Sequence, residues 1–539
     1  MASRPRSRHL ADLVGELAAA DSAATAVVDA AGELTYGELD ARVEALAMAL
    51  TGLGLGRGGT LGLLSTNRWE WVVAALAAHR LGARVAAFNT FAKAWDLRYM
   101  LSHSGAEVLV AVDAFRSRDY RQVLLELIPG LTEEGWEAPE FERLREVVVI
   151  GDRGELAGAR QFDELLGAGA GLAPEARAEA PWTSAGDQAF VLYTSGSSAR
   201  PKAVPLLHYG LIENGFSIGE RMGLTAADRV FVAVPLFWAY GAANALQTTL
   251  THGATMVLQQ AFEPEGALDL TEEHRCTAIY TLPNMTAALL DADGFEAGRV
   301  ATLRTGLTLG SQAEILRTAE ALGVEGICNI YGSTETYGNC CVTPAAWPLA
   351  RRAASQGPPL PGVTVRIVGG EDGAVLGPDA VGEIEVRGYL AGSYLDDVSG
   401  AGAAFGADGW FRTGDLGSLD DEGALHFHSR ATEMIKTGGI NVAPREVEEY
   451  IGLHPRVAAA AVVGVADEGA GEVVVAFVVP AEEGLTETDL RRFCADGIAG
   501  YKVPARVHLL DELPATDTGK LARRRLVEID GEATGGRVG

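Results

Sequence analysis

Strand-like and helix-like segments alternate twice along this chain of 539 residues. Between residues 58 and 115, short apolar runs such as Thr60–Leu64 are separated by a helix-like segment, Trp69–Leu81. Residues 227–330 repeat the alternation, with strand candidates at Val230–Val234 and Thr255–Leu258. A β-α-β rhythm of this kind is typical of mainly parallel sheets. We therefore expect an α/β protein whose large N-terminal part holds two such sheets.

The pattern changes after about residue 355. Three strand candidates separated by Gly/Asp turns predict a β-rich lobe: Val363–Val368, Gly382–Arg387 and Gly423–Phe427. From residue 431, two helical and two strand-like segments predict a compact α+β domain. We expect domains at 1–430 and 431–539, a frayed tail over residues 1–8, and disorder after Val527, where Gly and Glu are frequent.

Composition narrows the partners and the compartment. The net charge of −28 repels nucleic acid and anionic membranes, so neither is expected to bind. The five cysteines form no C-x-x-C pair, which argues against a disulfide scaffold or a zinc site and favours a reducing, cytoplasmic compartment. The longest apolar run, Val457–Ala466, is about half a membrane span, so no transmembrane helix is predicted.

A loop of small and hydroxyl-bearing residues lies between Val191 and Val204, directly after an apolar run. Backbone N–H groups in such a loop can close on a polyphosphate, and Lys202 adds a mobile positive charge. Lys202 does not follow a G-x-x-x-x-G pattern, so this is not a Walker loop. Taken alone, the segment is better explained as an ordinary Ser/Gly loop.

Four further segments follow in a fixed order: Tyr331–Thr336 (YGSTET), Gly409–Gly417 (GWFRTGDLG), Arg430–Glu448, and Leu513–Lys520 (LPATDTGK). With the loop, this set resembles the adenylate-forming superfamily, which contains acyl-CoA synthetases, stand-alone adenylation domains and luciferase-type enzymes. The resemblance covers about the whole chain, from Leu34 to Arg525. Five motifs in order are much more specific than any one of them.

The resemblance implies a role for each motif. In this family the loop holds the leaving phosphates of ATP, the YGSTE segment binds adenine, α-phosphate and Mg²⁺, and an aspartate and an arginine bind ribose. A glycine loop lines the pantetheine tunnel of CoA ligases once a small, mobile C-terminal domain has turned, and a lysine near the end of that domain is catalytic. The residues that match are Thr194, Ser195, Gly196, Ser197, Ser198 and Lys202 in the loop; Gly310, Ser311, Gln312, Tyr331, Gly332 and Ser333 around adenine; Thr334 at the α-phosphate; Glu335 at Mg²⁺; Asp415 and Arg430 at ribose; Lys436, Gly438 and Gly439 in the tunnel loop; and Lys520.

Simpler explanations stay open for several of these residues. Glu335 and Lys520 would also be unremarkable as solvated side chains, Arg430 as half of a surface ion pair, and the loop at Lys436 as a plain hairpin turn. The chain also departs from the family pattern. Ala199 and Ala203 stand where glycines are usual, and Thr432 stands where the hinge residue is usually charged.

The acid-binding segment is the least typical part of the chain. No aspartate lies between Val234 and Leu246 to pair with an α-ammonium group, so a free amino acid is not the expected substrate. The residues expected to outline an apolar pocket with one or two polar contacts are Trp238, Tyr240, Asn244, Asn284 and Thr308. Aromatic segments are also frequent in cores, so core packing remains the alternative for them.

The sequence thus predicts an enzyme that activates a small carboxylic acid with ATP and Mg²⁺ as acyl-AMP, releases pyrophosphate, and transfers the acyl group to CoA. Other acceptors remain open: a carrier-protein thiol, or an arylamine after activation of an acid such as nitrite. A degenerate nucleotide-binding protein is a further alternative, against which the presence of Glu335, Asp415 and Lys520 argues. A homodimer stays open.

Overall fold

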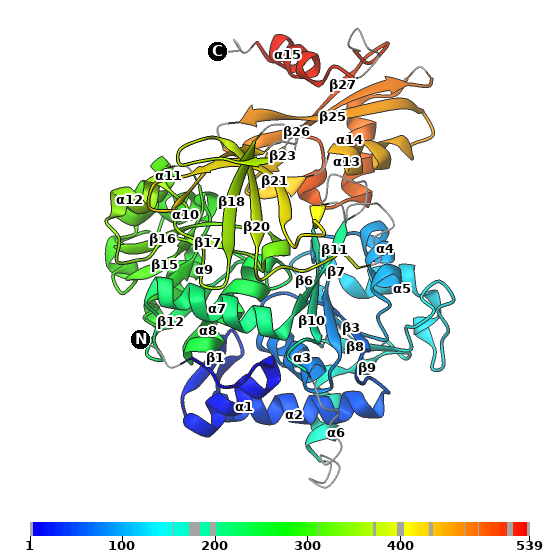
Figure 1. The fold of residues 1–539 in the computed structure, drawn as a ribbon. Helices are drawn as coiled ribbons and strands as arrows, with labels where there is room; N and C mark the ends of the chain where they lie inside the picture. Colours follow the sequence, from blue (N-terminus) through cyan, green and yellow to red (C-terminus); the bar gives the residue numbers. More distant parts are fainter. Residues whose placement is uncertain are drawn as a thin grey trace. The chain divides into compact units, whose positions relative to one another are not determined.

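The computed structural model describes residues 4–152, 154, 156–171, 184–194, 201–310, 312–369, 373–395, 404–430, 435–442, 444–467, 469–482, 484–514 and 521–535. The chain divides into two compact units, whose elements are labelled in Figure 1. The first comprises Met1–Thr90, Arg98–Tyr193 and Ala203–Ser429. The second comprises Phe91–Leu97, Thr194–Lys202 and Arg430–Gly539.

One sheet of the first unit has eight strands. Their spatial order is β17 (Cys341–Val342), β16 (Gly326–Tyr331), β15 (Thr305–Thr308), β14 (Ala278–Tyr280), β12 (Arg229–Val232), β13 (Thr255–Leu258), β1 (Thr25–Asp29) and β2 (Gly32–Thr35). Neighbouring strands are parallel from β16 to β1, and only the outer pairs β16–β17 and β1–β2 are antiparallel. The sheet therefore gathers the carboxyl ends of its inner strands along one edge.

A second sheet has seven strands. Their order is β11 (Lys202–Leu207), β10 (Gln188–Thr194), β4 (Arg84–Ala87), β3 (Thr60–Leu64), β5 (Val108–Val112), β8 (Glu146–Ile150) and β9 (Arg160–Gln161). The pairings from β10 to β9 are all parallel. Their side chains are largely buried on both faces, as the apolar runs in the sequence predict.

Helices accompany both sheets and bury apolar faces against them. In Figure 1 the first helix lies beside the second, and α7 lies beside α8. The second helix begins with a reciprocal cap in which the Thr35 side chain accepts from the Glu38 N–H and Glu38 accepts from the Thr35 N–H. The helices before residue 430 are α1 (Leu10–Ala20), α2 (Tyr36–Gly52), α3 (Trp69–Arg80), α4 (Ala94–Ser104), α5 (Tyr120–Leu127), α6 (Phe162–Ala170), α7 (His208–Met222), α8 (Leu246–His252), α9 (Pro264–Glu273), α10 (Pro283–Leu290), α11 (Gln312–Ala321) and α12 (Leu349–Ala354).

The predicted β-rich lobe is a five-stranded sheet in the first unit. Its order is β19 (Ala374–Val375), β18 (Thr364–Gly369), β20 (Gly382–Arg387), β21 (Phe411–Leu419) and β22 (Leu425–Arg430). The pairs from β19 to β21 are antiparallel. The core of this lobe includes Tyr331 of β16, so the end of a central parallel strand packs against the lobe.

The second unit is the predicted α+β domain. Its sheet has the order β24 (Ile440–Val442), β23 (Ile435–Thr437), β26 (Gly471–Pro480) and β25 (Val457–Asp467), with β27 (Arg506–Leu509) parallel to β26. The helices are α13 (Pro444–Gly452), α14 (Glu487–Gly497) and α15 (Arg523–Thr534). The expected fold class, two mainly parallel sheets with a β-rich lobe and a smaller C-terminal α+β domain, is confirmed.

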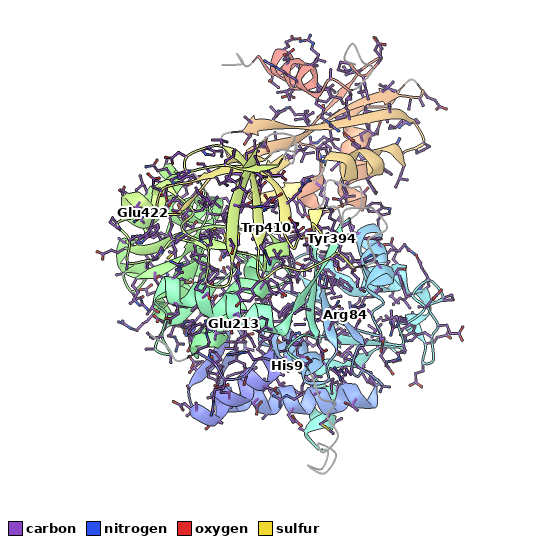
Figure 2. The ribbon with its side chains drawn as sticks, in the orientation of Figure 1. His9, Arg84, Glu213, Tyr394, Trp410 and Glu422 are labelled. Atoms are coloured by element: carbon purple, nitrogen blue, oxygen red, sulfur yellow. The ribbon has the colours of Figure 1, made fainter. Side chains whose placement is uncertain are left out.

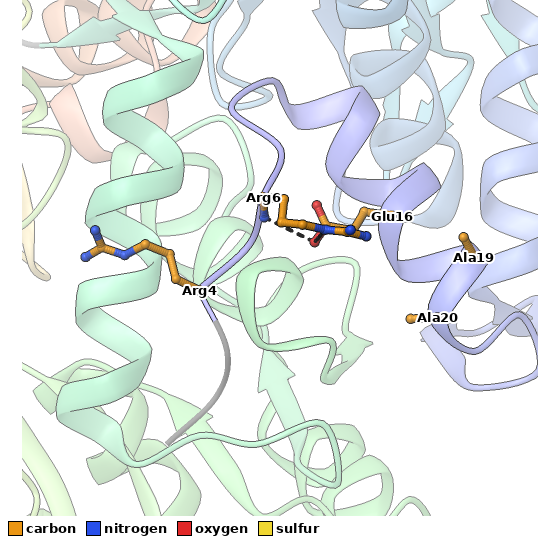
Figure 3. Close-up of a pocket in the computed structure, with 5 residues that line it drawn as sticks. All are labelled: Arg4, Arg6, Glu16, Ala19 and Ala20. Atoms are coloured by element: carbon orange, nitrogen blue, oxygen red, sulfur yellow. Dashed lines mark hydrogen bonds and ion pairs between the residues drawn. The ribbon is translucent and has the colours of Figure 1, made fainter.

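Two predictions at the chain ends are wrong. Residues 4–8 are not a frayed tail, because Arg4 and Arg8 pair with the buried Glu213 at 3.2 and 3.7 Å. Figure 3 shows Arg6 reaching Glu16 beside a pocket of about 430 Å³. Nor is the chain disordered directly after Val527, since α15 continues to Thr534. Apolar burial of Leu526 and an ion pair between Asp530 and Arg506 hold this helix in place, and composition alone does not reveal such contacts.

Among the residues that the structure describes, no helix combines the length and the apolar character needed to cross a bilayer.

Three buried histidines, His9, His79 and His208, lie close together in the first unit. The His9 ring stacks on His208 at a centroid distance of 3.7 Å, and His79 meets His208 edge-on at 4.9 Å; Figure 2 labels His9. Burial lowers the pKa of His9 to about 4 and that of His79 to about 3, and it also holds the pKa of His208 well below its usual range. The charges of Asp12 and Asp187 oppose this shift at His9, while Arg80 reinforces it.

We expect acid to destabilise the first unit through this cluster. Below pH 6.5 the unfolded histidines take up protons that the folded ones refuse, so the free energy of unfolding falls as pH decreases. At pH 5.5 the loss is about 1.4 kcal/mol for each histidine. Denaturant unfolding at pH 7.5 and 5.5 measures it. His79→Gln should reduce the difference between the two pH values.

Candidate active site

The carboxyl end of β16 delivers the YGSTE segment to the edge of the eight-stranded sheet. Ligands of open parallel sheets bind at this edge. After Tyr331 the chain turns back at once: a Cβ on Gly332 would lie 2.3 Å from the carbonyl oxygen of Gly338, so only glycine fits there. A short 3₁₀ turn, Thr334–Thr336, then carries Glu335. The turn is closed by Thr336, whose hydroxyl accepts from the Ser333 N–H at 2.9 Å.

Tyr331 and Asp415 form a buried pair. The Tyr331 hydroxyl donates to Asp415 Oδ2 at 2.8 Å, although 84 residues separate them. Tyr331 is 9% and Asp415 7% exposed, and Phe427 stacks on the Tyr331 ring at a centroid distance of 5.8 Å. Burial raises the pKa of Tyr331, and the Asp415 charge adds to this effect, so the phenol stays protonated and keeps donating. The structure thus brings Tyr331, predicted to bind adenine, into contact with Asp415, predicted to bind ribose.

Glu335 is held from the segment between β20 and β21. The Tyr394 hydroxyl donates to Glu335 Oε1 at 2.8 Å, and the Ala391 N–H donates to the Glu335 backbone carbonyl at 2.9 Å. The Tyr394 side chain, labelled in Figure 2, contacts the Phe405 ring at 5.4 Å. The sequence motif identified Glu335 but not Tyr394, because nothing in the local pattern shows a bond across 59 residues.

Tyr337 is a second residue that the sequence did not single out. Its backbone is left-handed, with φ of 59°, directly after the turn that carries Glu335. Its hydroxyl accepts from the Leu207 N–H at 3.0 Å, and its carbonyl accepts from Asn244 Nδ2 at 2.9 Å. A Cβ on Gly210 would lie 2.4 Å from the Tyr337 ring. This unusual backbone and close packing fix the turn against β11 and α7.

The remaining adenine residues follow β15. Gly310 has φ of 150°, Gln312 begins α11, and Ser311 lies outside the described residues. Thr308, at the end of β15, is 1% exposed. Its hydroxyl makes no hydrogen bond within the part of the chain that the structure describes. A buried polar atom in this position costs free energy unless a ligand or water contacts it.

The predicted acid-pocket residues differ in exposure. Trp238 and Tyr240 are partly buried against the core, and the Tyr240 hydroxyl donates to the Thr281 carbonyl at 3.3 Å. Asn244 is fully buried in a short π-helix, Ala239–Ala245, whereas Asn284 is exposed. Asn244 Oδ1, like the Thr308 hydroxyl, has no hydrogen-bond partner among the described residues. That these residues together line an acid pocket stays a prediction.

The other predicted residues belong to the second unit. Thr194 ends β10 and Lys202 begins β11, while Ser195, Gly196, Ser197 and Ser198 lie outside the described residues. Lys436 lies in β23, and Gly438 and Gly439, with φ of 56° and 80°, form the hairpin turn to β24. Arg430 ends β22. Thr432 and the catalytic candidate Lys520 are likewise outside the described part of the chain.

The donor set at Glu335 suits Mg²⁺ better than a transition metal. Among the described residues, no group of three or more His, Cys, Asp or Glu side chains could hold a metal on its own. Mg²⁺ is commonly held by one or two carboxylates together with the phosphates of a substrate and water. A single carboxylate such as Glu335, beside the predicted nucleotide-binding residues, meets that requirement.

A buried tyrosine–carboxylate pair and a separate carboxylate follow the carboxyl end of β16, at the edge where open parallel sheets bind their ligands. The family model of the AMP-binding enzymes matches residues 16–395, and the model of their C-terminal domain matches residues 446–520. The chain belongs to the AMP-binding enzyme family. It is an AMP-forming ligase of the acyl-CoA synthetase type, which activates an acid as acyl-AMP and transfers it to CoA.

The similar proteins include two CoA synthetases and one amide bond synthetase. The YngI protein of Bacillus subtilis (strain 168), which carries the name of an acyl-CoA synthetase, is 32% identical over 92% of this chain and 91% of its own length. The fold is similar to o-succinylbenzoate CoA synthetase (MenE) from Bacillus subtilis, with TM-score 0.78, 27% identity and coverage of 98% and 99% of the two chains. It is also similar to the amide bond synthetase McbA from Marinactinospora thermotolerans, with TM-score 0.80, 26% identity and coverage of 97% and 99%.

Proposed function

We propose that this enzyme activates an apolar carboxylic acid with MgATP, and that Tyr331, Asp415 and Glu335 form the nucleotide side of its site. The observation that carries this proposal is the buried hydrogen bond from Tyr331 to Asp415 beside Phe427. The aromatic ring suits the adenine face, and a carboxylate suits the two vicinal hydroxyls of ribose. Mg²⁺, held by Glu335, would lower the charge of the phosphates when bound.

The chemistry needs two anions to meet. A carboxylate oxygen of the acid forms a bond to the α-phosphorus as the bond to the bridging oxygen breaks and pyrophosphate leaves. The thiol of CoA then attacks the acyl carbon, and AMP leaves. Because like charges repel, positioning and positive charge supply most of the catalysis. We assign the positive charges to Lys202 and Lys520, and the α-phosphate contact to Thr334.

The residues that we expect to line the acid pocket favour an apolar substrate. Trp238 and Tyr240 offer aromatic surface. The side-chain oxygens of Asn244 and Thr308, which have no hydrogen-bond partner among the described residues, offer one or two polar contacts. We further propose a cytoplasmic location, in line with five cysteines that are all free and buried. The acceptor is CoA. The amide-forming neighbour makes an amine the outcome to look for if CoA has no effect.

A pyrophosphate-exchange screen over aliphatic and aromatic acids, followed by addition of CoA, tests this proposal. We expect exchange with apolar acids, none with free amino acids, and a thioester with release of AMP once CoA is added. Rapid exchange that CoA does not convert into a thioester would contradict the acceptor. Exchange with amino acids alone would contradict the apolar pocket.

Asp415→Ala tests the nucleotide side of the site. Loss of a charged hydrogen-bond partner of ribose should raise the KM for ATP about tenfold or more. Deoxy-ATP should suffer less, since it already lacks one hydroxyl. Asp415→Asn keeps the size of the side chain and can still accept from Tyr331, but it lacks the negative charge. A loss in this variant therefore reports on the ribose contact and not on packing. Asp421→Ala, an exposed carboxylate in the turn after β21, is the control. Equal losses with both nucleotides would refute the ribose assignment.

A further inference from the structure

The hydroxyl of Tyr394 is aimed at the carboxylate of Glu335. The two oxygens lie 2.8 Å apart, and Tyr394 is 7% exposed, so the phenol is a buried donor with a fixed direction. The Phe405 ring packs edge-on against the Tyr394 ring, with a centroid distance of 5.4 Å, and limits rotation of the side chain. A donor on one oxygen of a carboxylate fixes the orientation of the whole group.

Two backbone hydrogen bonds hold the segment that carries Tyr394. The Ala391 N–H donates to the Glu335 carbonyl at 2.9 Å, and the Leu395 N–H donates to the Ala203 carbonyl at 2.9 Å. Ala203 follows Lys202 in the sequence and is 2% exposed. The segment 391–395 is therefore attached both to the turn that carries Glu335 and to the strand that leaves the phosphate loop. These two hydrogen bonds hold the backbone on both sides of Tyr394 in the sequence.

The partner of Glu335 is neutral. Within the described residues, no Lys, Arg or His side chain forms an ion pair with Glu335, whereas other partly or fully buried carboxylates, such as Glu213 and Glu385, pair with arginines. A guanidinium would compensate the negative charge and compete with a cation. A phenol orients the carboxylate and leaves its charge available.

We propose that Tyr394 is a positioning residue for Glu335, holding the carboxylate in the orientation that receives the Mg²⁺ of MgATP. This rests on the proposed function, because it requires Glu335 to be the metal contact. Side chains that orient the ligands of a metal ion in this way commonly contribute about ten- to a hundredfold to metal affinity. Tyr394 acts through Glu335 and does not itself touch the nucleotide.

Nucleotide binding, measured by calorimetry with and without Mg²⁺, tests the proposal without relying on activity. In the native enzyme Mg²⁺ should strengthen ATP binding. Tyr394→Phe keeps the ring against Phe405 and removes only the hydroxyl, so it should reduce that gain by about tenfold and leave metal-free ATP binding unchanged. Glu335→Gln should reduce the gain at least as much, and the double variant should show no further loss. Tyr209→Phe, which removes an exposed hydroxyl bonded to Tyr389, is the matched control and should behave as the native enzyme.

The outcomes separate the two proposals. If Glu335→Gln keeps the full Mg²⁺ gain, the metal role of Glu335 in the proposed function fails. If Glu335→Gln loses the gain but Tyr394→Phe keeps it, only the positioning role of Tyr394 is overturned. If Tyr394→Phe weakens metal-free ATP binding as much as MgATP binding, its role is packing, and the inference is overturned as well.

Discussion

Replacement of Lys520 by alanine should reduce acyl-adenylate formation by at least about a hundredfold. The lysine ends the segment that matches the family's C-terminal domain, and its sequence context, LPATDTGK, is the motif on which its predicted catalytic role depends. A flexible ammonium group can lie between the attacking carboxylate and the α-phosphate, where two negative charges must approach each other. Removing one such donor typically costs two to three orders of magnitude in rate, as removal of an oxyanion-hole donor does.

The second half-reaction should be spared, because attack of the CoA thiol on acyl-AMP no longer requires two anions to meet at phosphorus. Thioester formation from supplied acyl-AMP, measured beside pyrophosphate exchange, distinguishes the steps. Arg524→Ala is the control, since that side chain is 96% exposed and, among the described residues, forms an ion pair only with Glu528 on the same helix. An equal loss in both half-reactions would assign Lys520 to folding or to another step.

Much of the fold follows from local patterns. The strand expected at Thr60–Leu64 is β3, and the helix expected at Trp69–Leu81 is α3, one residue shorter. Buried parallel strands need continuous apolar runs, so they are visible in sequence. The short edge strands β2 and β27 were not predicted, because edges are defined by their neighbours rather than by their own composition.

The sequence motifs singled out residues of the candidate site, but they did not predict the contacts between them. Tyr331, Glu335 and Asp415 stand in motifs, yet the bond that joins Tyr331 to Asp415 spans 84 residues. Tyr394 and Tyr337 lie outside the residues that the motifs single out, and their role depends on where distant strands meet. A contact of this kind is a property of the folded chain, and no local propensity encodes it.

A buried charge in the second unit likewise depends on contacts between residues far apart in the sequence. Lys502 Nζ lies 3.3 Å from Asp96 Oδ1 and 2.5 Å from Glu446 Oε1, and all three residues are at most 5% exposed. Burial alone would lower the pKa of Lys502, but Tyr501 and the carboxylates of Glu446 and Asp96 raise it instead, so the ammonium stays charged. The buried ammonium group of Lys502 thus compensates the negative charges of both carboxylates.

Lys502→Met should therefore destabilise the second unit by about 3–5 kcal/mol, because two buried carboxylates lose a cation that contacts both of them. The triple variant Asp96→Asn, Glu446→Gln and Lys502→Met should recover most of the loss, since no unpaired charge remains. Lys93→Met is the matched control: its ammonium makes an exposed hydrogen bond to the Ala495 carbonyl at 2.9 Å, and its loss should cost no more than about 0.5 kcal/mol.

Hydrogen exchange of the amides of α13 and α14 measures this unit directly, because Glu446 lies in the first of these helices. Faster exchange in Lys502→Met, restored in the triple variant, would show that the penalty comes from uncompensated charge. If the triple variant exchanges as fast as Lys502→Met, the cost comes from lost packing of the long lysine side chain instead. The ion triad would then contribute little, as replacements of buried ion pairs by apolar residues have shown for other proteins.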